Sequence, residues 1–359
     1  MKIDGRAYRT IWRSGARSVE ALDQTRLPHE LVFHRIDTLD GAAAAIRTMI
    51  VRGAPLIGAT AAYGLAIALA AAADDDGLEA AYAQLLASRP TAVNLRYALE
   101  DVRAVVAPLP PQARAEAAFA RADAICEEDV AQNLAIGEAG FKLIEAAHLR
   151  TGRTVNVLTH CNAGWLATVD WGTATAPIYL AHDRGVPVHV WVDETRPRNQ
   201  GASLTAFELG QHGVPHTLVA DNAGGHLMQR GLVDLCIVGA DRVTARGDVA
   251  NKIGTYLKAL AARAHDVPFY VALPGPTIDW RLDDGLAIEI EERSPREVTH
   301  VWGRLDDGRV AEVMIAPAGT SAANPAFDVT PAELVTGLIT ERGLVAAERG
   351  ALAAIYGRG

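Results

Sequence analysis

Apolar and polar positions follow two different patterns along the chain. Up to about residue 150 the apolar residues are mainly alanines and leucines at helical spacing, as in Ala42–Met49 and in the Ala- and Glu-rich stretch Pro111–Leu149. Between these stretches, the uncharged segment Gly53–Ala73 carries Pro55 where the first turn of a helix is expected. The pattern therefore predicts a mainly helical region over residues 1–150.

The segment Gly53–Ala73 is long enough to cross a bilayer. It consists mostly of Ala, Gly and Thr, with few Leu and Ile, and such a composition inserts poorly into a membrane. We therefore expect a helix buried inside the protein, and no membrane partner.

A second pattern begins at Thr154, where short β-branched runs alternate with stretches long enough for a crossover helix. The runs are TVNVLTH, VPVHVWVD, PHTLVA, VDLCIVGAD and VPFYVAL. This alternation is typical of an α/β fold with a parallel, doubly wound sheet covered by helices on both faces. The turn at Thr151-Gly152-Arg153 divides the chain into a helical domain, 1–150, and a sheet domain, 151–359.

Polar clusters follow four of these runs, and ligands bind beyond the carboxyl ends of parallel strands. They are His160-Cys161-Asn162, Asp193-Glu194-Thr195-Arg196, Asp221-Asn222 and Asp241-Arg242. A free cysteine is most often a small buried apolar residue, and this interpretation fits Cys126 and Cys236. For Cys161, which has polar neighbours, a functional role and a packing role are equally supported. Asp241 is either a turn cap or a catalytic acid.

Several basic residues precede predicted helices and suit a phosphate. Arg52 stands before Gly53 and Ala54 at a helix start, and Arg89 offers a second guanidinium. Asn251 and Lys252 are predicted to open a helix whose N-terminus attracts an anion.

The segment after the second run adds two more candidates. Gln200 is placed to bind sugar hydroxyls, whereas Arg196 either joins it or forms a structural ion pair with Glu194 or Asp193.

Composition and charge argue against several other classes of protein. The formal net charge of −9 disfavours a nucleic-acid partner. Three cysteines without a CxxC pair suggest neither a disulfide framework nor zinc, and the scattered histidines mark no metal site. No GxGxxG follows any run, which disfavours an NAD-dependent oxidoreductase, so no cofactor is expected. The N-terminus lacks an apolar signal region, so the cytoplasm is the expected compartment.

Six segments in order resemble the 5-methylthioribose-1-phosphate isomerase family, which is related to regulatory subunits of the translation-initiation guanine-nucleotide exchange factor. They are VRGAPLIG, SRPTAVNL, LTHCNAGWLAT, DETRPRNQGASLTAFEL, VGADRVTARGDVANKIGTY and NPAFDVTP. The resemblance implies a Rossmann-like second domain, a homodimer, and an aldose–ketose isomerase of methionine salvage acting on a sugar phosphate. It implies Cys161 and Asp241 as the catalytic pair and substrate contacts from Arg52, Gly53, Ala54, Arg89, Gln200, Asn251 and Lys252.

Two alternatives remain open. One is an isomerase of 5-deoxyribose 1-phosphate or ribose 1,5-bisphosphate, and the other is a non-catalytic regulatory subunit that senses a phosphorylated sugar. The presence of both Cys161 and Asp241 favours an enzyme. The catalytic hypothesis requires the thiol and the carboxyl group to meet at one small cavity.

Overall fold

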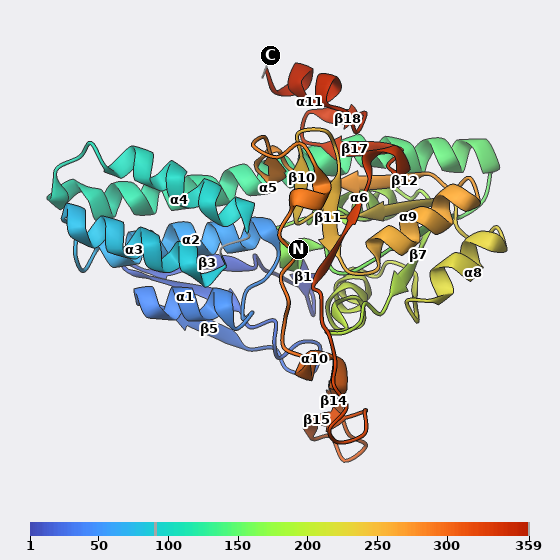
Figure 1. The fold of residues 1–359 in the computed structure, drawn as a ribbon, viewed down its shortest axis with the longest axis horizontal. Coiled ribbons are helices and arrows are strands. Elements are labelled where there is room, and N and C mark those ends of the chain that lie inside the picture. Colours follow the sequence, from blue (N-terminus) through green and yellow to red (C-terminus); the bar gives the residue numbers. More distant parts are fainter. Residues whose placement is uncertain (90–91, 358–359) are drawn as a thin grey trace.

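A helical layer and a parallel sheet lie side by side and share one long helix, α5 (Pro111–Thr151), in the computed structural model (Figure 1). The structure describes residues 1–89 and 92–357. The first half of α5, with Phe119 and Cys126, packs in the core of the helical layer, and its second half, with Ile136 and Ile144, packs in the core of the sheet.

The helical layer confirms the predicted helical region from residue 39 onward. Besides α5 it comprises α1 (Leu39–Arg47), α2 (Ala54–Leu69), α3 (Asp75–Ser88) and α4 (Val93–Val106). Every residue of α2 except Pro55 is buried, and Pro55 lies in the first turn as predicted. Among the described residues, no helix combines the length and apolarity that crossing a membrane requires.

Short strands before residue 39 did not follow from the sequence pattern. They are β1 (Lys2–Ile3), β2 (Arg6–Ala7), β3 (Ile11–Gly15), β4 (Ser18–Leu22) and β5 (Phe33–Ile36). The last three form an antiparallel sheet. Ile3 and Leu22 are buried in the same core as the parallel sheet, so the N-terminal segment packs across to the second half of the molecule.

The main sheet has seven strands and contains all five predicted runs. They are β6 (Val155–Thr159), β7 (Val188–Asp193), β8 (His216–Val219), β9 (Leu235–Val238) and β12 (Phe269–Ala272), followed by β17 (Gly337–Thr340) and β18 (Gly343–Val345). The order is β18-β17-β12-β9-β6-β7-β8, and only β18 pairs antiparallel. The α/β fold with a parallel sheet is therefore confirmed.

The direction of the chain reverses at β6. From β6 it runs to β7 and β8 on one side and then returns to β9 on the other side of β6. Ligands bind in the crevice beyond the strand ends at such a reversal. The helices between these strands are α6 (Ala176–Asp183), α7 (Ala206–His212), α8 (Ala223–Gln229) and α9 (Thr255–Ala264).

A smaller sheet lies beyond the end of β9, with the order β13-β10-β11-β16. Its strands are β13 (Ile278–Asp279), β10 (Arg242–Thr244), β11 (Val249–Lys252) and β16 (Phe327–Thr330). After α10 (Arg296–Thr299), the hairpin of β14 (His300–Arg304) and β15 (Val310–Met314) projects from the body (Figure 1). The chain then returns through β16–β18 to α11 (Arg349–Tyr356).

The prediction that Asn251 and Lys252 open a helix was wrong. Both belong to β11, where they pair with Asp328 and Phe327 of β16. Helix α9 starts only at Thr255, after Gly254 with φ 101°. Because such a positive φ suits glycine, the turn from strand to helix is made at Gly254 rather than at Asn251.

Candidate active site

Cys161 and Asp241 line one cavity at the reversal of the sheet. Cys161 follows β6 and Asp241 follows β9, and these strands are neighbours. Arg52, Gly53, Ala54 and Asn251 line the same cavity. The strand order thus brings together two residues that are far apart in the sequence, along with four of the expected substrate contacts.

The backbone of Cys161 is held on both sides. Its N–H donates to Thr195 Oγ1 at 2.8 Å, and its carbonyl accepts from Thr205 Oγ1 at 2.7 Å. Its φ of 67° is unusual for a residue with a side chain. The thiol lies 3.5 Å from Gln200 Oε1, to which it donates. These contacts fix where the sulfur points.

Charges of both signs surround the thiol. Burial raises the pKa of Cys161, the positive charges of Arg52 and Lys252 offset part of that rise, and the Asp241 carboxylate adds to it. A thiol with a raised pKa is protonated at neutral pH. Cys161 therefore rests as a thiol.

Arg52 is a buried guanidinium that Asn162 aims at the cavity. Its two terminal nitrogens donate to the side-chain oxygen and, at 2.8 Å, to the backbone carbonyl of Asn162. Asn162 Nδ2 in turn donates to Glu208 Oε1 at 3.0 Å. Glu208 is buried and also accepts from the Leu166 amide and from the Tyr179 hydroxyl. Burial raises the pKa of Glu208 to about 7.

Gly53 and Ala54 place the N-terminus of α2 against this cavity. Gly53 has φ 92°, and a Cβ there would lie 2.5 Å from the backbone of Ala167. The N-cap position of α2 has no side-chain cap. Its first amide groups and the helix dipole therefore form an anion-binding feature beside Arg52.

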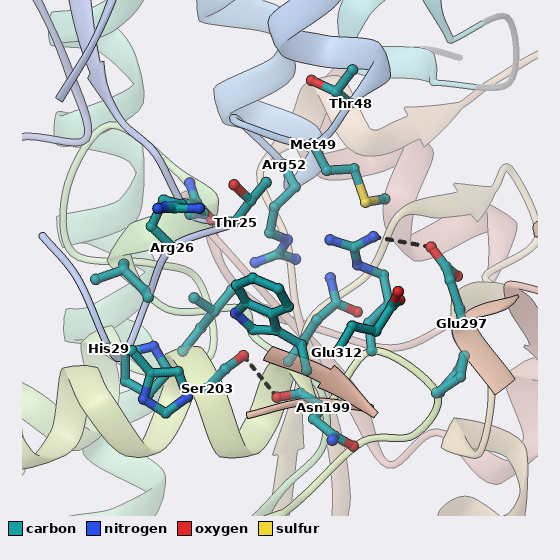
Figure 2. A pocket seen from close by; sticks show the side chains of 18 of the residues that line it. Thr25, Arg26, His29, Thr48, Met49, Arg52, Asn199, Ser203, Glu297 and Glu312 are labelled. Carbon is teal, nitrogen blue, oxygen red and sulfur yellow. Dashed lines mark hydrogen bonds and ion pairs between the residues drawn. The ribbon is translucent and has the colours of Figure 1, made fainter. Parts of the chain in front are cut away.

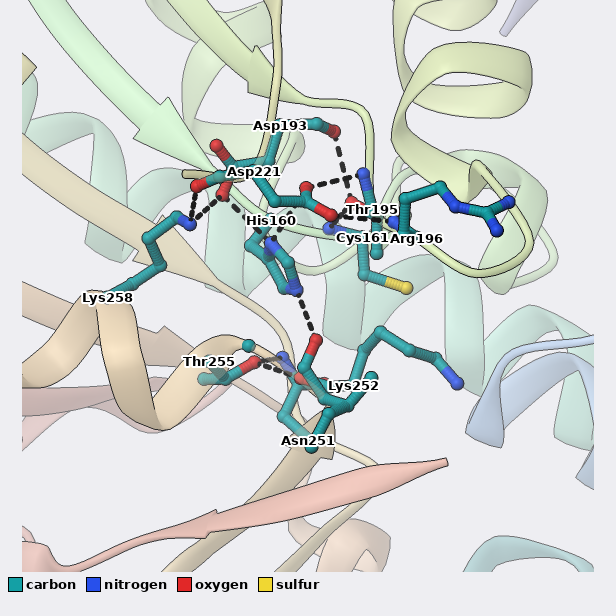
Figure 3. Close-up of polar contacts among 12 residues, drawn as sticks. His160, Cys161, Asp193, Thr195, Arg196, Asp221, Asn251, Lys252, Thr255 and Lys258 are labelled. Atoms are coloured by element: carbon teal, nitrogen blue, oxygen red, sulfur yellow. Dashed lines mark hydrogen bonds and ion pairs between the residues drawn. The ribbon is translucent and has the colours of Figure 1, made fainter. Parts of the chain in front are cut away.

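Lys252 points to the same side as the Cys161 thiol (Figure 3). It is buried, its Nζ donates to the Ala326 carbonyl at 2.9 Å, and it lies 4.7 Å from the centre of the Phe327 ring. Burial lowers the pKa of Lys252, while Cys161 and Asp241 oppose that change. Asn251 Nδ2 donates to Thr255 Oγ1 at 3.1 Å.

The predicted anion site at the start of α9 is already filled. Asp328 accepts from the amides of Gly254 at 2.7 Å and Tyr256 at 3.1 Å. The Asp328 carboxylate therefore occupies the position that was expected for a phosphate. Lys252 reaches the site from β11 rather than from the start of α9.

Two further cavities adjoin the central one. Arg89 lines the first, together with Ala54 and Asp241, and pairs with Glu291 at 2.9 Å. Arg52 and Gln200 line the second, which has a volume of about 400 Å³ (Figure 2). Six of the seven expected contact residues thus line these three cavities. The seventh, Lys252, interacts through its charge with both Cys161 and Asp241.

Arg196 does not form the predicted ion pair with Glu194 or Asp193. Its guanidinium donates to the carbonyls of Pro197 at 2.5 Å and Val298 at 2.7 Å. Asp193 instead pairs with His160 and Lys258.

In the described chain, one group of possible metal ligands lies close together, namely His160, Asp193 and Asp221. His160 Nδ1 lies 2.8 Å from Asp193 Oδ2, and Lys258 Nζ lies 3.1 Å from the same oxygen. These atoms already bind one another, so a metal ion would have to displace an ammonium group and break this hydrogen bond.

Sequence reasoning missed Glu208 as part of the site. It placed His160, Asn162 and Thr195 in the polar clusters after the strands but gave them no individual role. Asn162 and His160 flank Cys161, and that position was the available signal. Glu208 carried none, because a helix residue 46 positions from Asn162 is brought to it only by tertiary packing.

The model of the Initiation factor 2 subunit family matches residues 50–347. The chain belongs to this family. Curated relatives named methylthioribose-1-phosphate isomerase cover nearly its whole length. The protein from Methylobacterium nodulans is 65% identical over 99% of this chain and 98% of its own, and that from Paramagnetospirillum magneticum is 63% identical over 99% of both.

Solved structures share the fold. The 5-methylthioribose 1-phosphate isomerase from Pyrococcus horikoshii OT3 has a TM-score of 0.84 and 40% identity, covering 99% of this chain and 97% of that one. A structure titled translation initiation factor eIF-2B, subunit delta, from A. fulgidus has a TM-score of 0.78 and 38% identity, covering 97% and 99%.

Proposed function

We propose that this protein is an aldose–ketose isomerase that converts 5-methylthioribose 1-phosphate to 5-methylthioribulose 1-phosphate in methionine salvage. The observation that carries the proposal is the shared cavity of Cys161 and Asp241, with Arg52 and the open N-terminus of α2 beside it. Full-length relatives at 62–65% identity carry the name of this activity.

Asp241 supplies the acid in this proposal. The substrate is a cyclic aldose whose C1 oxygen carries phosphate, so the ring opens only if the bond between C1 and the ring oxygen breaks. Asp241 gives its proton to the ring oxygen as that bond breaks. Hydrogen then moves from C2 to C1, and the C2 hydroxyl returns a proton to the Asp241 carboxylate as the ketone forms.

Cys161 decides how the hydrogen moves. Abstraction of the C2 proton needs a thiolate, whereas burial keeps Cys161 as a thiol. We therefore favour direct transfer of hydride from C2 to C1, with the protonated thiol held by its hydrogen bond to Gln200. Arg52, the amides of Gly53 and Ala54, Arg89, Asn251 and Lys252 bind the phosphate and the sugar hydroxyls.

Substrate deuterated at C2 tests this route in water. Full retention of deuterium at C1 of the product is expected, and loss of the label to solvent would exclude hydride transfer in favour of proton abstraction.

Two substitutions test the roles of the pair. Asp241→Asn is expected to lower kcat by about 10²–10⁴-fold, as removal of a general acid does. Cys161→Ser is expected to lower kcat as well, because the thiol adjoins the reacting carbons. Cys126→Ser, in the helical core, is the control and keeps kcat. Near-normal turnover of either site variant would refute its role.

The substituent at C5 separates this activity from its alternatives. Turnover should be highest on 5-methylthioribose 1-phosphate when compared with 5-deoxyribose 1-phosphate and ribose 1,5-bisphosphate. Binding of all three without turnover would instead support a regulatory subunit that senses a phosphorylated sugar. We also propose a cytoplasmic homodimer, on the basis of the family resemblance.

A further inference from the structure

His160 connects two strand ends that both carry site residues. It directly precedes Cys161 after β6, and its Nε2 lies 2.8 Å from the carbonyl of Ile253, the residue after Lys252 (Figure 3). Its Nδ1 lies 2.8 Å from Asp193 Oδ2 at the end of β7. The His160 side chain is fully buried, so water does not compete for either nitrogen.

Both ring nitrogens of His160 face acceptors. A backbone carbonyl only accepts, so Nε2 must carry a hydrogen. Asp193 Oδ2 already receives Lys258 Nζ at 3.1 Å, which keeps that oxygen an ionised acceptor and requires a hydrogen on Nδ1 as well. A neutral imidazole has only one N–H. We propose that His160 is an imidazolium in the resting protein and is a positioning residue that fixes Cys161 relative to Lys252.

The charges around the ring support this protonation state. Asp193 on β7 and Asp221 after β8, the latter at 3.9 Å, face Nδ1, and Asp328 on β16 interacts electrostatically with His160. Lys258 of α9 is the basic group that pairs with this cluster. One ammonium does not balance three carboxylates, of which Asp193 is buried and the other two are half-buried, and a charged His160 reduces that imbalance.

Gly254 is shaped to permit the contact with Ile253. A Cβ at this position would lie 3.0 Å from His160 Cε1 and 3.1 Å from Nε2. The φ of 101° favours glycine, and any larger residue would also push the His160 ring away. The turn after β11 therefore leaves room for the His160 ring, and the contact between His160 and Ile253 depends on a glycine at position 254.

The consequence for catalysis rests on the proposed function. The main sheet carries Cys161, and the small sheet carries Asn251 and Lys252. His160 is the charged link between these two sheets, so its loss lets the thiol and the phosphate-binding ammonium shift relative to each other. Misplacement by about 1 Å costs about 10²-fold in rate.

Nitrogen NMR of the full-length protein with labelled histidines tests the protonation state directly. The chain has 11 histidines, and the His160→Gln variant identifies the resonances of His160 by their loss. We expect two protonated ring nitrogens at pH 7 to 8. One protonated and one bare nitrogen would overturn the inference.

Three variants test the positioning role. His160→Gln is expected to lower kcat by about 10²-fold with KM changed only a few-fold. Asp193→Asn, which removes the carboxylate and retains its shape, is expected to convert His160 to a ring with one bare nitrogen and to lower kcat as well. His265→Gln, at an exposed position after α9, is the matched control and should leave kcat unchanged.

The outcomes separate the inference from the proposed function. Unchanged kcat in a folded His160→Gln protein overturns the positioning role. If His160→Gln does not fold, the resonances of His160 are identified instead by their shift in Asp193→Asn, and the measurement on the wild-type protein still decides. A wild-type protein without isomerase activity but with two protonated ring nitrogens refutes the proposed function and supports the imidazolium.

Discussion

The orientation of Arg52 depends on one amide side chain. Asn162 accepts hydrogen bonds from the guanidinium with its side-chain and backbone oxygens. Its side-chain N–H donates a hydrogen bond to the buried Glu208. An arginine held in this way binds an anion without first losing side-chain freedom, which preserves affinity.

Asn162→Ala should therefore weaken substrate binding. A hydrogen bond to a charged group contributes about 1.5–3 kcal/mol, which corresponds to a rise in KM of about tenfold or more. Steady-state kinetics check this expectation. Asn133→Ala, a buried amide on α5 that bonds the Asp129 carbonyl, is the control for burial alone and should leave KM unchanged.

Asp129 gives the stability a pH dependence. Burial raises the pKa of its carboxyl group to about 7 in the folded protein from an ordinary 3.8. Between about pH 4 and pH 7 the unfolded chain has lost this proton while the folded protein retains it. Stability contributed by this site therefore falls as pH rises through that range.

The Asp129→Asn variant removes this proton equilibrium. Its Tm relative to wild type should rise from pH 5 to pH 8, because only the wild type has to bury a charge at the higher pH. Thermal unfolding at several pH values measures the difference. A difference in Tm that stays constant with pH would contradict the assignment.

At the scale of elements, the start of α2 combines a strained backbone with a close contact. Gly53→Ala places a methyl group within 2.5 Å of the Ala167 backbone. Gly185 also has a positive φ, 76°, but a Cβ there would meet nothing within 4 Å. The pair thus separates the cost of backbone conformation from that of the contact.

Gly185→Ala should cost about 1–2 kcal/mol from its backbone conformation alone. Gly53→Ala should cost more and should also reduce activity, because the first amides of α2 move away from the cavity. Chemical denaturation and kinetics of both variants provide the comparison. Equal losses of stability would show that the contact with Ala167 is relaxed without cost.

The elements that the sequence predicted well are those with a strong apolar pattern. The almost wholly buried α2 and the central strand β9 stand out because every face of each is covered. Strands β1–β5 were missed because they are two to five residues long and mix charged with apolar positions. The site followed a similar rule, since residues next to strand ends were found and Glu208, which reaches the site by packing, was not.

At the scale of the whole molecule, the β14–β15 hairpin projects from the body (Figure 1) and carries several exposed apolar side chains. Trp302, Val313, Met314 and Ile315 are 44%, 46%, 52% and 58% exposed. Exposed apolar groups of this kind commonly mark a contact surface.

The proposed homodimer should have twice the mass of the 38.1 kDa chain in light scattering. Trp302→Asp combined with Val313→Asp should shift the mass toward the monomer if the hairpin contributes to that contact. Leu286→Asp, at another highly exposed leucine, is the control. A wild-type protein with the mass of one chain would refute the homodimer.

The position of Arg52 between two cavities has a practical consequence for inhibitor chemistry. The central cavity holds Cys161 and Asp241, and the larger one beside it, with a volume of about 400 Å³, is lined by Met49, Leu204 and Trp302. A compound that anchors an acidic group on this arginine and extends a thioether or aryl arm into the larger space would contact residues remote from the reacting carbons. Such a scaffold offers a route to selectivity over compounds that mimic only the sugar phosphate.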